Sequence, residues 1–282
     1  MKKIFLSAAV IGLLASCSQT EGLSVDNSTA DSRQIHLSVG VGDLQTRAGY
    51  NSENLEQFQL IIDNPGNAEY SYNILMQKGD DGWNTSSGEA LMWDPNTPNI
   101  TVCAFAPAKD DVSLTNGTLE IKLSDNQSTE DALKTADFLL MKKVVNLQNE
   151  NGKLDIKLKH KLCKLIVKPV SGESVASVEG LKVNGAVLSG TCDLTMAMPT
   201  VATSATAGTA SITPFKNAEG AYECILLPQD AGGLTVTFNI GNMDYEWKSD
   251  EAQLTEGTCY TLTMNVDTSA SNLTAVRQAD NN

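Results

Sequence analysis

Histidine is nearly absent from the 282-residue chain, which contains only His36 and His160. Zinc sites and acid–base catalysis often rely on histidine, so both have few candidate residues here. Basic side chains are also few, because 20 Lys and Arg stand against 34 Asp and Glu and the net charge is −14. Nucleic-acid binding needs basic side chains that neutralise phosphates, so this balance argues against a nucleic-acid partner.

The motifs of common enzymes and cofactor sites are missing as well. The chain has no G-x-S-x-G, H-E-x-x-H, Walker or EF-hand spacing, and Gly40-Val41-Gly42 lacks the third glycine of a dinucleotide fingerprint. His160 falls on the apolar side of an alternating segment, which favours a hydrogen-bonded core histidine over a catalytic base. The sequence therefore predicts no enzyme, no catalytic residue, no metal and no cofactor.

The cysteines show no spacing of a zinc site or a redox pair. Beyond Cys17 there are five, an odd number that cannot all pair, and no two are spaced as CxxC. Most lie in apolar runs, which predicts small buried hydrophobic residues, with one disulfide in the second half left open. These five are Cys103, Cys163, Cys192, Cys224 and Cys259.

Long hydrophobic runs are missing except at the start of the chain. Lys2 and Lys3 precede the apolar run Ile4–Ala15. Twelve helical residues reach about 18 Å, which is too short for a hydrocarbon core of about 30 Å. A basic segment followed by a short apolar run is typical of a secretory signal peptide, so we interpret this segment as one rather than as a membrane anchor.

The end of this run has the pattern of a bacterial lipobox. Leu14-Ala15-Ser16-Cys17 supplies a large apolar residue, two small residues and a thiol that can accept a diacylglycerol group. We therefore predict a lipoprotein signal peptide at 1–16 and lipidation of Cys17, with an ordinary cleavage site beside a disulfide cysteine as the alternative. Two or more acyl chains give durable membrane anchoring. Because Ser18 stands where an inner-membrane retention aspartate would be, the outer membrane is the expected location.

Long helix-forming blocks are also missing, and short alternating segments take their place, which indicates an all-β fold. After a polar tether, four apolar residues alternate with polar or small ones and predict a half-buried strand: Ile35, Leu37, Val39 and Val41. An exposed connection, Asp43–Gly49, follows and contains Arg47, which an Arg-specific protease can reach. We treat 17–47 as a lipidated tether with a removable first strand, and Arg47 with Ala48 as the processing site.

The rest of the chain divides into two halves with about seven short strands each. Asn149–Gly152 is polar and turn-forming, so we predict antiparallel β-sandwich domains at 48–149 and 150–267, and a polar tail at 268–282. The second half opens with alternation over Leu154–Leu162, and its apolar phase shifts near Cys163, which predicts a bulge or bend. The single helix candidate is Ser128–Thr135, with Ser128 as its N-cap.

Several segments in this order resemble the fimbrillin family of lipoprotein-derived (type V) pili. They are the lipobox, Ile35–Val41 ending near Thr46-Arg47-Ala48, Phe58–Pro65, Tyr70–Tyr72, Trp83, Leu91–Trp93, Ile100–Pro107, Leu154–Val167, Ile225–Gln229 and Glu256–Val266. The resemblance covers nearly the whole chain after the signal. It implies two transthyretin-like β-sandwiches, export as a surface lipoprotein and polymerisation into fimbriae. It also implies that cleavage after an arginine releases the first strand, whose groove a strand from another subunit then fills.

The identity of that donor strand stays open in the sequence. Residues Asp267–Asn282 lack clean alternation, so the candidate donor is the preceding segment, or else the chain is an accessory, tip or anchor subunit with Cys17 lipidated and Arg47 uncut. The candidate donor residues are Tyr260, Leu262, Met264 and Val266.

The expected partners are other fimbrial subunits, an Arg-specific protease, the outer membrane before processing, and a host or glycan receptor. The expected location is a surface-exposed fimbrium. An alternative function is a lipid-anchored carbohydrate-binding adhesin that does not polymerise. It is suggested by Trp83, Trp93 and Trp247, although tryptophans more often pack in a core.

Overall fold

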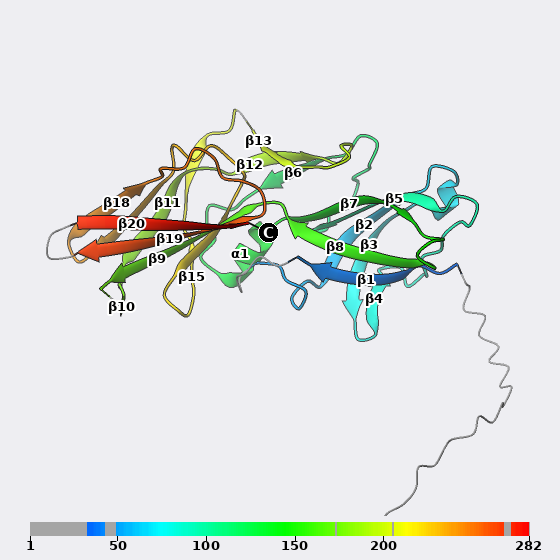
Figure 1. Ribbon diagram of the computed structural model, residues 1–282, viewed down its shortest axis with the longest axis horizontal. Coiled ribbons are helices and arrows are strands. Elements are labelled where there is room, and N and C mark those ends of the chain that lie inside the picture. The colour runs from blue at the N-terminus through cyan, green and yellow to red at the C-terminus, as the bar shows by residue number, and fades with distance from the viewer. Residues whose placement is uncertain (1–32, 43–48, 173, 205, 268–271, 282) are drawn as a thin grey trace, which may run out of the picture. The chain divides into compact units, whose positions relative to one another are not determined.

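The computed structural model describes residues 33–42, 49–172, 174–204, 206–267 and 272–281 (Figure 1). Strands make up 55% of the described residues and helices 4%, which confirms the predicted all-β class. Residues 33–282 form one compact unit by their contacts. No helix in the described parts of the chain has the length and apolarity needed to cross a membrane.

The first sheet has seven strands and carries the N-terminal edge of the fold. Every neighbouring pair is antiparallel except the first, which is parallel. In spatial order the strands are β1 (His36–Val41), β8 (Lys153–His160), β7 (Leu139–Asn146), β5 (Asn99–Ala106), β2 (Gln57–Asp63), β3 (Tyr72–Gly79) and β4 (Gly82–Thr85). A short 3₁₀ helix, η1 (Ala68–Tyr70), lies between β2 and β3.

β2 shows why these residues form a central strand. Phe58 and Leu60 point into one hydrophobic core while Ile61 points into another, so the strand is apolar on both faces. It ends at Asp63, and the next residue is Asn64, whose Oδ1 accepts hydrogen bonds from the backbone N–H groups of Gly66 and Asn67 at 3.0 and 3.1 Å. Asparagine favours this turn geometry, and it stops the strand where the sequence changes to polar residues.

Two further sheets pack face to face and enclose a second core. One of them, called the second sheet below, contains β15 (Phe215–Lys216), β16 (Tyr222–Leu226), β9 (Cys163–Ser171), β19 (Thr258–Asp267) and β20 (Asn272–Asn281), with β10 (Ser174–Val175) paired to β9. The other contains β14 (Thr209–Ile212), β11 (Glu179–Val187), β17 (Thr235–Ile240) and β18 (Met243–Lys248). Their inner residues, such as Leu262 and Phe238, belong to one buried cluster, which is the packing of a β-sandwich.

A third core joins residues from both halves of the chain. It packs Phe105 of β5 with Leu119, Cys192 and Ile225, all buried. Three short strands and the one α-helix of the described residues surround it: β13 (Val201–Thr203), β12 (Ser189–Asp193), β6 (Thr118–Lys122) and α1 (Glu130–Ala136). The predicted helix is present, but its N-cap is Thr129 rather than Ser128, because Thr129 Oγ1 accepts the hydrogen bond of Ala132 N at 3.1 Å.

The alternating segment near the middle of the sequence serves two cores. Leu154, Ile156 and Leu158 of β8 lie in the core of the first sheet, whereas Cys163 and Leu165 of β9 lie in the core of the sandwich. The change of apolar phase is a break between two strands, at residues 161 and 162, at which the chain passes from one sheet to the next. The division drawn between 149 and 150 therefore falls in the turn between β7 and β8, inside the first sheet. The organisation into two domains stays a prediction.

Candidate functional site

β1 is an edge strand of the first sheet and carries the residues predicted to be exchangeable. It runs parallel to β8, from His36 opposite Lys153 to Val41 opposite Leu158. Backbone hydrogen bonds continue this pairing at each end, from His36 N to Gly152 O at 2.9 Å and from Gly42 N to Leu158 O at 2.8 Å. No strand of the described residues pairs with its other edge, which is held by single hydrogen bonds from Ile35 N to Leu91 O at 2.7 Å and from Val41 N to Ser52 Oγ at 3.0 Å.

The side chains of β1 separate into a core face and a solvent face, as the alternation indicates. Ile35 is 5% exposed and is part of the hydrophobic core of the first sheet, which is called the first core below. Leu37, Val39 and Val41 are partly buried and pack against the same core, whereas His36 and Ser38 are exposed. The strand is thus bound both by a ladder of backbone bonds and by four apolar side chains.

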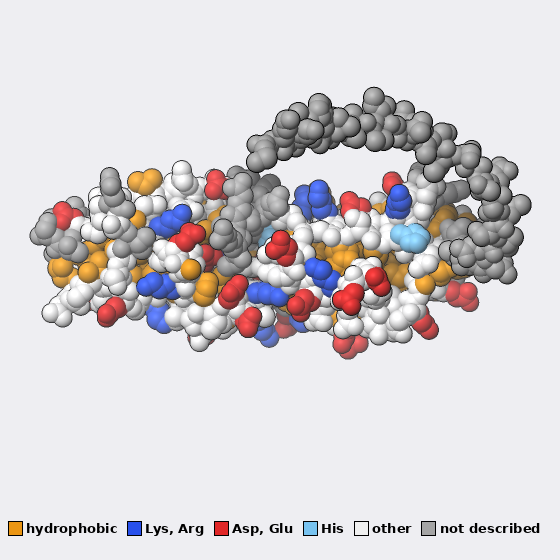
Figure 2. Space-filling model, turned by 90° about the horizontal axis from the view of Figure 1, so that it is seen from below, with side chains coloured by type: hydrophobic (Ala, Val, Ile, Leu, Met, Phe, Trp, Pro, Cys, Tyr) orange, Lys and Arg blue, Asp and Glu red, His pale blue; other side chains and the backbone are white. Residues whose placement is uncertain are grey.

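A cleft of about 370 Å³ lies between β1 and β4, which form the two edges of the first sheet. Leu37, Met76, Trp83 and Leu91 supply its apolar lining, and Glu89 lies among its polar residues. Seen from below, hydrophobic side chains reach the surface on the part of the molecule that carries β1 and β4 (Figure 2). The core of the first sheet is therefore partly open beside β1.

On its other side β8 is only weakly joined to the sheet. β7 and β8 pair at two positions, Leu139 with His160 and Leu140 with Lys159. Further along, side chains of β7 contact the β8 backbone instead: Lys143 Nζ donates to Asp155 O at 2.5 Å, and Lys157 N donates to Met141 Sδ at 3.4 Å. A groove of about 700 Å³ opens beside these residues. β8 consequently has its longest backbone pairing with β1.

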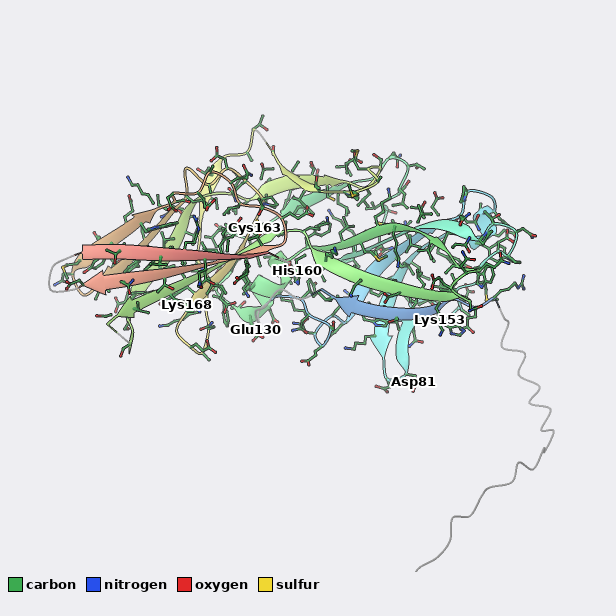
Figure 3. The ribbon with its side chains drawn as sticks, in the orientation of Figure 1. Asp81, Glu130, Lys153, His160, Cys163 and Lys168 are labelled. Atoms are coloured by element: carbon green, nitrogen blue, oxygen red, sulfur yellow. The ribbon has the colours of Figure 1, made fainter. Side chains whose placement is uncertain are left out.

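Just after the predicted processing site, the backbone at Tyr50 contacts a buried pair of side chains, Asp137 and His160. Cys17, Arg47 and Ala48 lie outside the described residues. Tyr50 N donates to Asp137 Oδ2 at 3.2 Å, and the same oxygen lies 2.8 Å from His160 Nδ1. His160 is buried at the end of β8 (Figure 3), which confirms the predicted core histidine. Burial and the Asp137 charge both raise the pKa of Tyr50.

The candidate donor residues lie in the middle of the second sheet. β19 pairs with β9 on one side in parallel and with β20 on the other side antiparallel. Tyr260, Leu262, Met264 and Val266 are each at most 4% exposed. This strand therefore contributes to the sandwich core along its whole length.

Sequence reasoning missed β20, which occupies part of the expected polar tail. It lies at the edge of its sheet, with Leu273 and Ala275 partly buried against the core and Val276 62% exposed. Arg277 fixes it to the loop after β18 through ion pairs with Asp250, at 3.0 Å, and with Glu251. The available signal was the spacing of Leu273 and Ala275, which is weak because alanine is small.

The three tryptophans do not form one surface. Trp83 packs edge-on against Phe58, with ring centroids 4.9 Å apart, and Trp93 packs against the same core. Trp247 packs against the core of the sandwich. Each thus covers a hydrophobic core, and Trp83 alone of the three lines the cleft beside β1.

The five described cysteines are free thiols and all are buried. Burial raises the pKa of Cys103 and of Cys224 to about 12, because the thiolate loses its hydration there. Within the described ranges, no three His, Cys, Asp or Glu side chains gather as a metal site would require. The arrangement offers strand edges and apolar clefts, which are features of protein association.

Comparison with known proteins concerns nearly the whole chain. The sequence profile of the fimbrillin-like family matches residues 46–278. No curated protein matches the chain.

Solved structures share the fold at low sequence identity. A “putative cell adhesion protein” of Bacteroides uniformis has a TM-score of 0.67 at 15% identity, covering 89% of this chain and 99% of its own. A protein of the same description from Bacteroides ovatus has a TM-score of 0.67 at 19% identity, covering 88% and 97%. A fimbrial protein of Bacteroides vulgatus has a TM-score of 0.57 at 13% identity, covering 88% and 99%.

Proposed function

Because the chain belongs to the fimbrillin-like family, we propose that it is a subunit of cell-surface fimbriae that polymerises by protease-triggered strand exchange and supports adhesion. The observation that carries the proposal is β1, an edge strand that among the described strands pairs with β8 alone. The predicted protease site, Arg47 with Ala48, follows β1 in the sequence and precedes Gly49. Cleavage after Arg47 leaves the β1 segment connected to the rest of the chain by non-covalent contacts alone.

The precursor is proposed to reach the outer membrane as a lipoprotein with acylated Cys17. Cleavage between Arg47 and Ala48 separates the lipid, the tether and β1 from the chain that starts at Ala48. Loss of β1 removes four apolar side chains from the first core and exposes one edge of β8. An exposed strand edge beside an open apolar core is a template for pairing with another chain.

For the donor we propose β20 in place of β19. Withdrawing β19 would remove four core side chains and separate β9 from β20, whereas β20 pairs with β19 alone among the described strands. Its contacts with the core come from small or partly buried side chains such as Leu273 and Ala275. A donor at the edge of its own sheet, whose departure leaves the rest of that sheet paired, suits a head-to-tail filament.

The test uses an Arg-specific protease, because the chain has three arginines, Arg33, Arg47 and Arg277. Treatment of the purified chain should give a new N-terminus at Ala48 and a ladder of oligomers on denaturing gels. Arg47→Lys should abolish both results, and Arg33→Lys is the matched control that should abolish neither.

Removal of residues 272–282 separates cleavage from assembly. The truncated chain should still be cut at Arg47 but should form no oligomers. A wild-type chain that is cut and stays monomeric contradicts strand exchange. If it also binds glycans through Trp83, the non-polymerising adhesin is the better description.

A further inference from the structure

Two neighbouring strands of the first sheet, β7 and β8, pair only at one end. Their two paired positions lie at the His160 end of β8, whereas Lys153 marks the other end (Figure 3). Away from the paired end lies the groove of about 700 Å³, which we call the β7–β8 groove. It is lined by residues 36–38, 143–146, 150 and 153–155. The first sheet thus has an opening between two of its strands.

The edge of β7 that faces this groove carries backbone groups without a strand opposite them. Successive residues of a strand direct their N–H and C=O groups to opposite sides. Leu147 N, just after β7, donates to Pro98 O at 3.0 Å on the β5 side, so odd-numbered residues of β7 are directed to β5. Lys142 and Val144 are therefore directed toward β8, and the pairing of β7 with β8 does not reach them.

The facing edge of β8 is occupied by side chains instead of a strand. Even-numbered residues of β8 are directed to β1, as the bond to Leu158 O shows, so Asp155 and Lys157 are directed to β7. Lys143 Nζ donates to Asp155 O at 2.5 Å, and Lys157 N donates to Met141 Sδ at 3.4 Å. A thioether is a weak acceptor and an ammonium group is a mobile donor, so another partner can replace both.

Two strand edges that face each other across a groove fit an extended chain. Such a chain offers N–H and C=O groups at the spacing that both edges need, as in β-strand addition. We propose that the β7–β8 groove binds β20 of a second copy while β1 is still in place. This inference rests on the proposed strand exchange and adds the place at which the incoming strand first binds.

The charges of the groove suit a second copy of the chain. Its charged side chains are two basic and two acidic ones: Lys143, Lys153, Glu150 and Asp155. The groove thus carries no net charge, although the whole chain carries −14, and an equally acidic copy is not repelled there. In β20 the charges of Arg277 and Asp280 cancel as well.

Binding in this groove has a direct consequence for the order of exchange. The incoming strand pairs with β8 on the side opposite to β1, so β8 keeps a ladder of backbone bonds when β1 departs. Without this first contact, the loss of β1 leaves β8 paired at two positions only. Unpaired backbone groups are costly, so the groove lowers the cost of releasing β1.

The test uses the full chain with Arg47→Lys, which stays uncut and keeps both β1 and its own β20. The probe is a synthetic peptide of residues 272–282, and the measurement is hydrogen exchange followed by mass spectrometry. At about ten times the dissociation constant of the peptide, exchange in segments 142–146 and 153–157 should slow about tenfold, because one tenth of the chain is free. Exchange in β19 should not change, and a peptide with the same residues in scrambled order should slow neither strand.

Unchanged exchange in β7 and β8 at about 1 mM peptide overturns the inference, since specific binding lies below this concentration. If the cleaved wild-type chain polymerises in that case, strand exchange stands and only the β7–β8 groove is rejected. Slower exchange at the groove supports the inference even where cleavage is not followed by polymerisation, a result that counts against strand exchange alone.

Two substitutions in β7 test the backbone edge itself. Val144→Pro removes an N–H group that faces the groove but leaves the ladder with β5, as proline does at a strand edge. It should abolish the protection by the peptide, whereas Val144→Ala keeps the N–H group and should keep the protection. Lys143→Ala frees Asp155 O and should bind the peptide several-fold more tightly. If Val144→Pro does not fold, Lys143→Ala decides, and unchanged or weaker binding there contradicts the inference.

Discussion

Replacing Ile35 by alanine tests whether β1 opens independently of the rest of the fold. Ile35 is 5% exposed and lies in the first core, just before β1 begins. Truncation of a buried isoleucine to alanine costs between about 2 and 5 kcal/mol, and an edge position that can partly collapse belongs to the lower part of this range. We expect Ile35→Ala to lower the free energy of β1 opening by about 2 to 3 kcal/mol, which is roughly a 30- to 150-fold change in the open population.

Hydrogen exchange followed by mass spectrometry measures this change. Peptides that cover β1 and β8 should exchange faster in Ile35→Ala, because the two strands share their ladder. Peptides that cover β19 should keep their wild-type rate, since β19 belongs to a different core. Ser38→Ala is the matched control, because Ser38 lies on the exposed face of the same strand and its loss should change the opening energy by less than about 0.5 kcal/mol.

Two outcomes would refute this reasoning. Unchanged exchange in β1 would mean that Ile35 does not hold the strand. An equal acceleration in β1 and β19 would mean that the chain unfolds as a whole and that β1 is not a separable element. Either result would also remove the physical basis for releasing β1 by one cut at Arg47.

Leu262→Ala should lower the free energy of unfolding, measured by urea denaturation, by about 2 to 5 kcal/mol, because Leu262 is 1% exposed. The control is Gln278→Ala on the exposed face of β20, which should change that free energy by less than about 0.5 kcal/mol. Equal effects of the two substitutions would contradict the assignment of β19 to the core and β20 to the edge. Cys103 and Cys224 should resist iodoacetamide at pH 8 until the chain is unfolded, because burial raises the pKa of each thiol from 9.0 to about 12. Folding favours the protonated thiols, so the stability they contribute is present below pH 9.0 and is lost as the pH rises toward about 12. Rapid labelling of the native chain would show that the two thiols are accessible and would contradict this prediction.

The strands that the sequence predicts well are those whose signal is local. Leu154, Ile156 and Leu158 alternate with charged residues, and β8 shows the same alternation of buried and exposed positions. Phe58–Asp63 lies within β2 because its apolar run ends at a strong turn. In both cases neighbouring residues suffice, since the period of the pattern reveals the element and its buried face.

Pairings between distant segments leave no such signal. Nothing near Ile35 indicates that β1 pairs in parallel with a strand more than 100 residues later. The shift of apolar phase near Cys163 predicts a bulge or bend in one strand, yet the residues on its two sides form separate strands that fill different cores. β20 was missed because an edge strand needs little apolar surface, so its residues resemble a tail.

The position of β8 constrains how strand exchange can proceed. β8 pairs with β1 over six residues but with β7 over two, and side chains of Lys143 and Met141 contact its backbone along the rest. If β1 leaves before another strand arrives, β8 loses most of its backbone pairing while Leu154, Ile156 and Leu158 still need cover from water. Such an opened edge is unfavourable, because unpaired backbone groups and exposed apolar side chains both cost free energy. The incoming strand is therefore expected to pair with β8 as β1 departs, so that cleavage permits the exchange and the neighbouring subunit completes it.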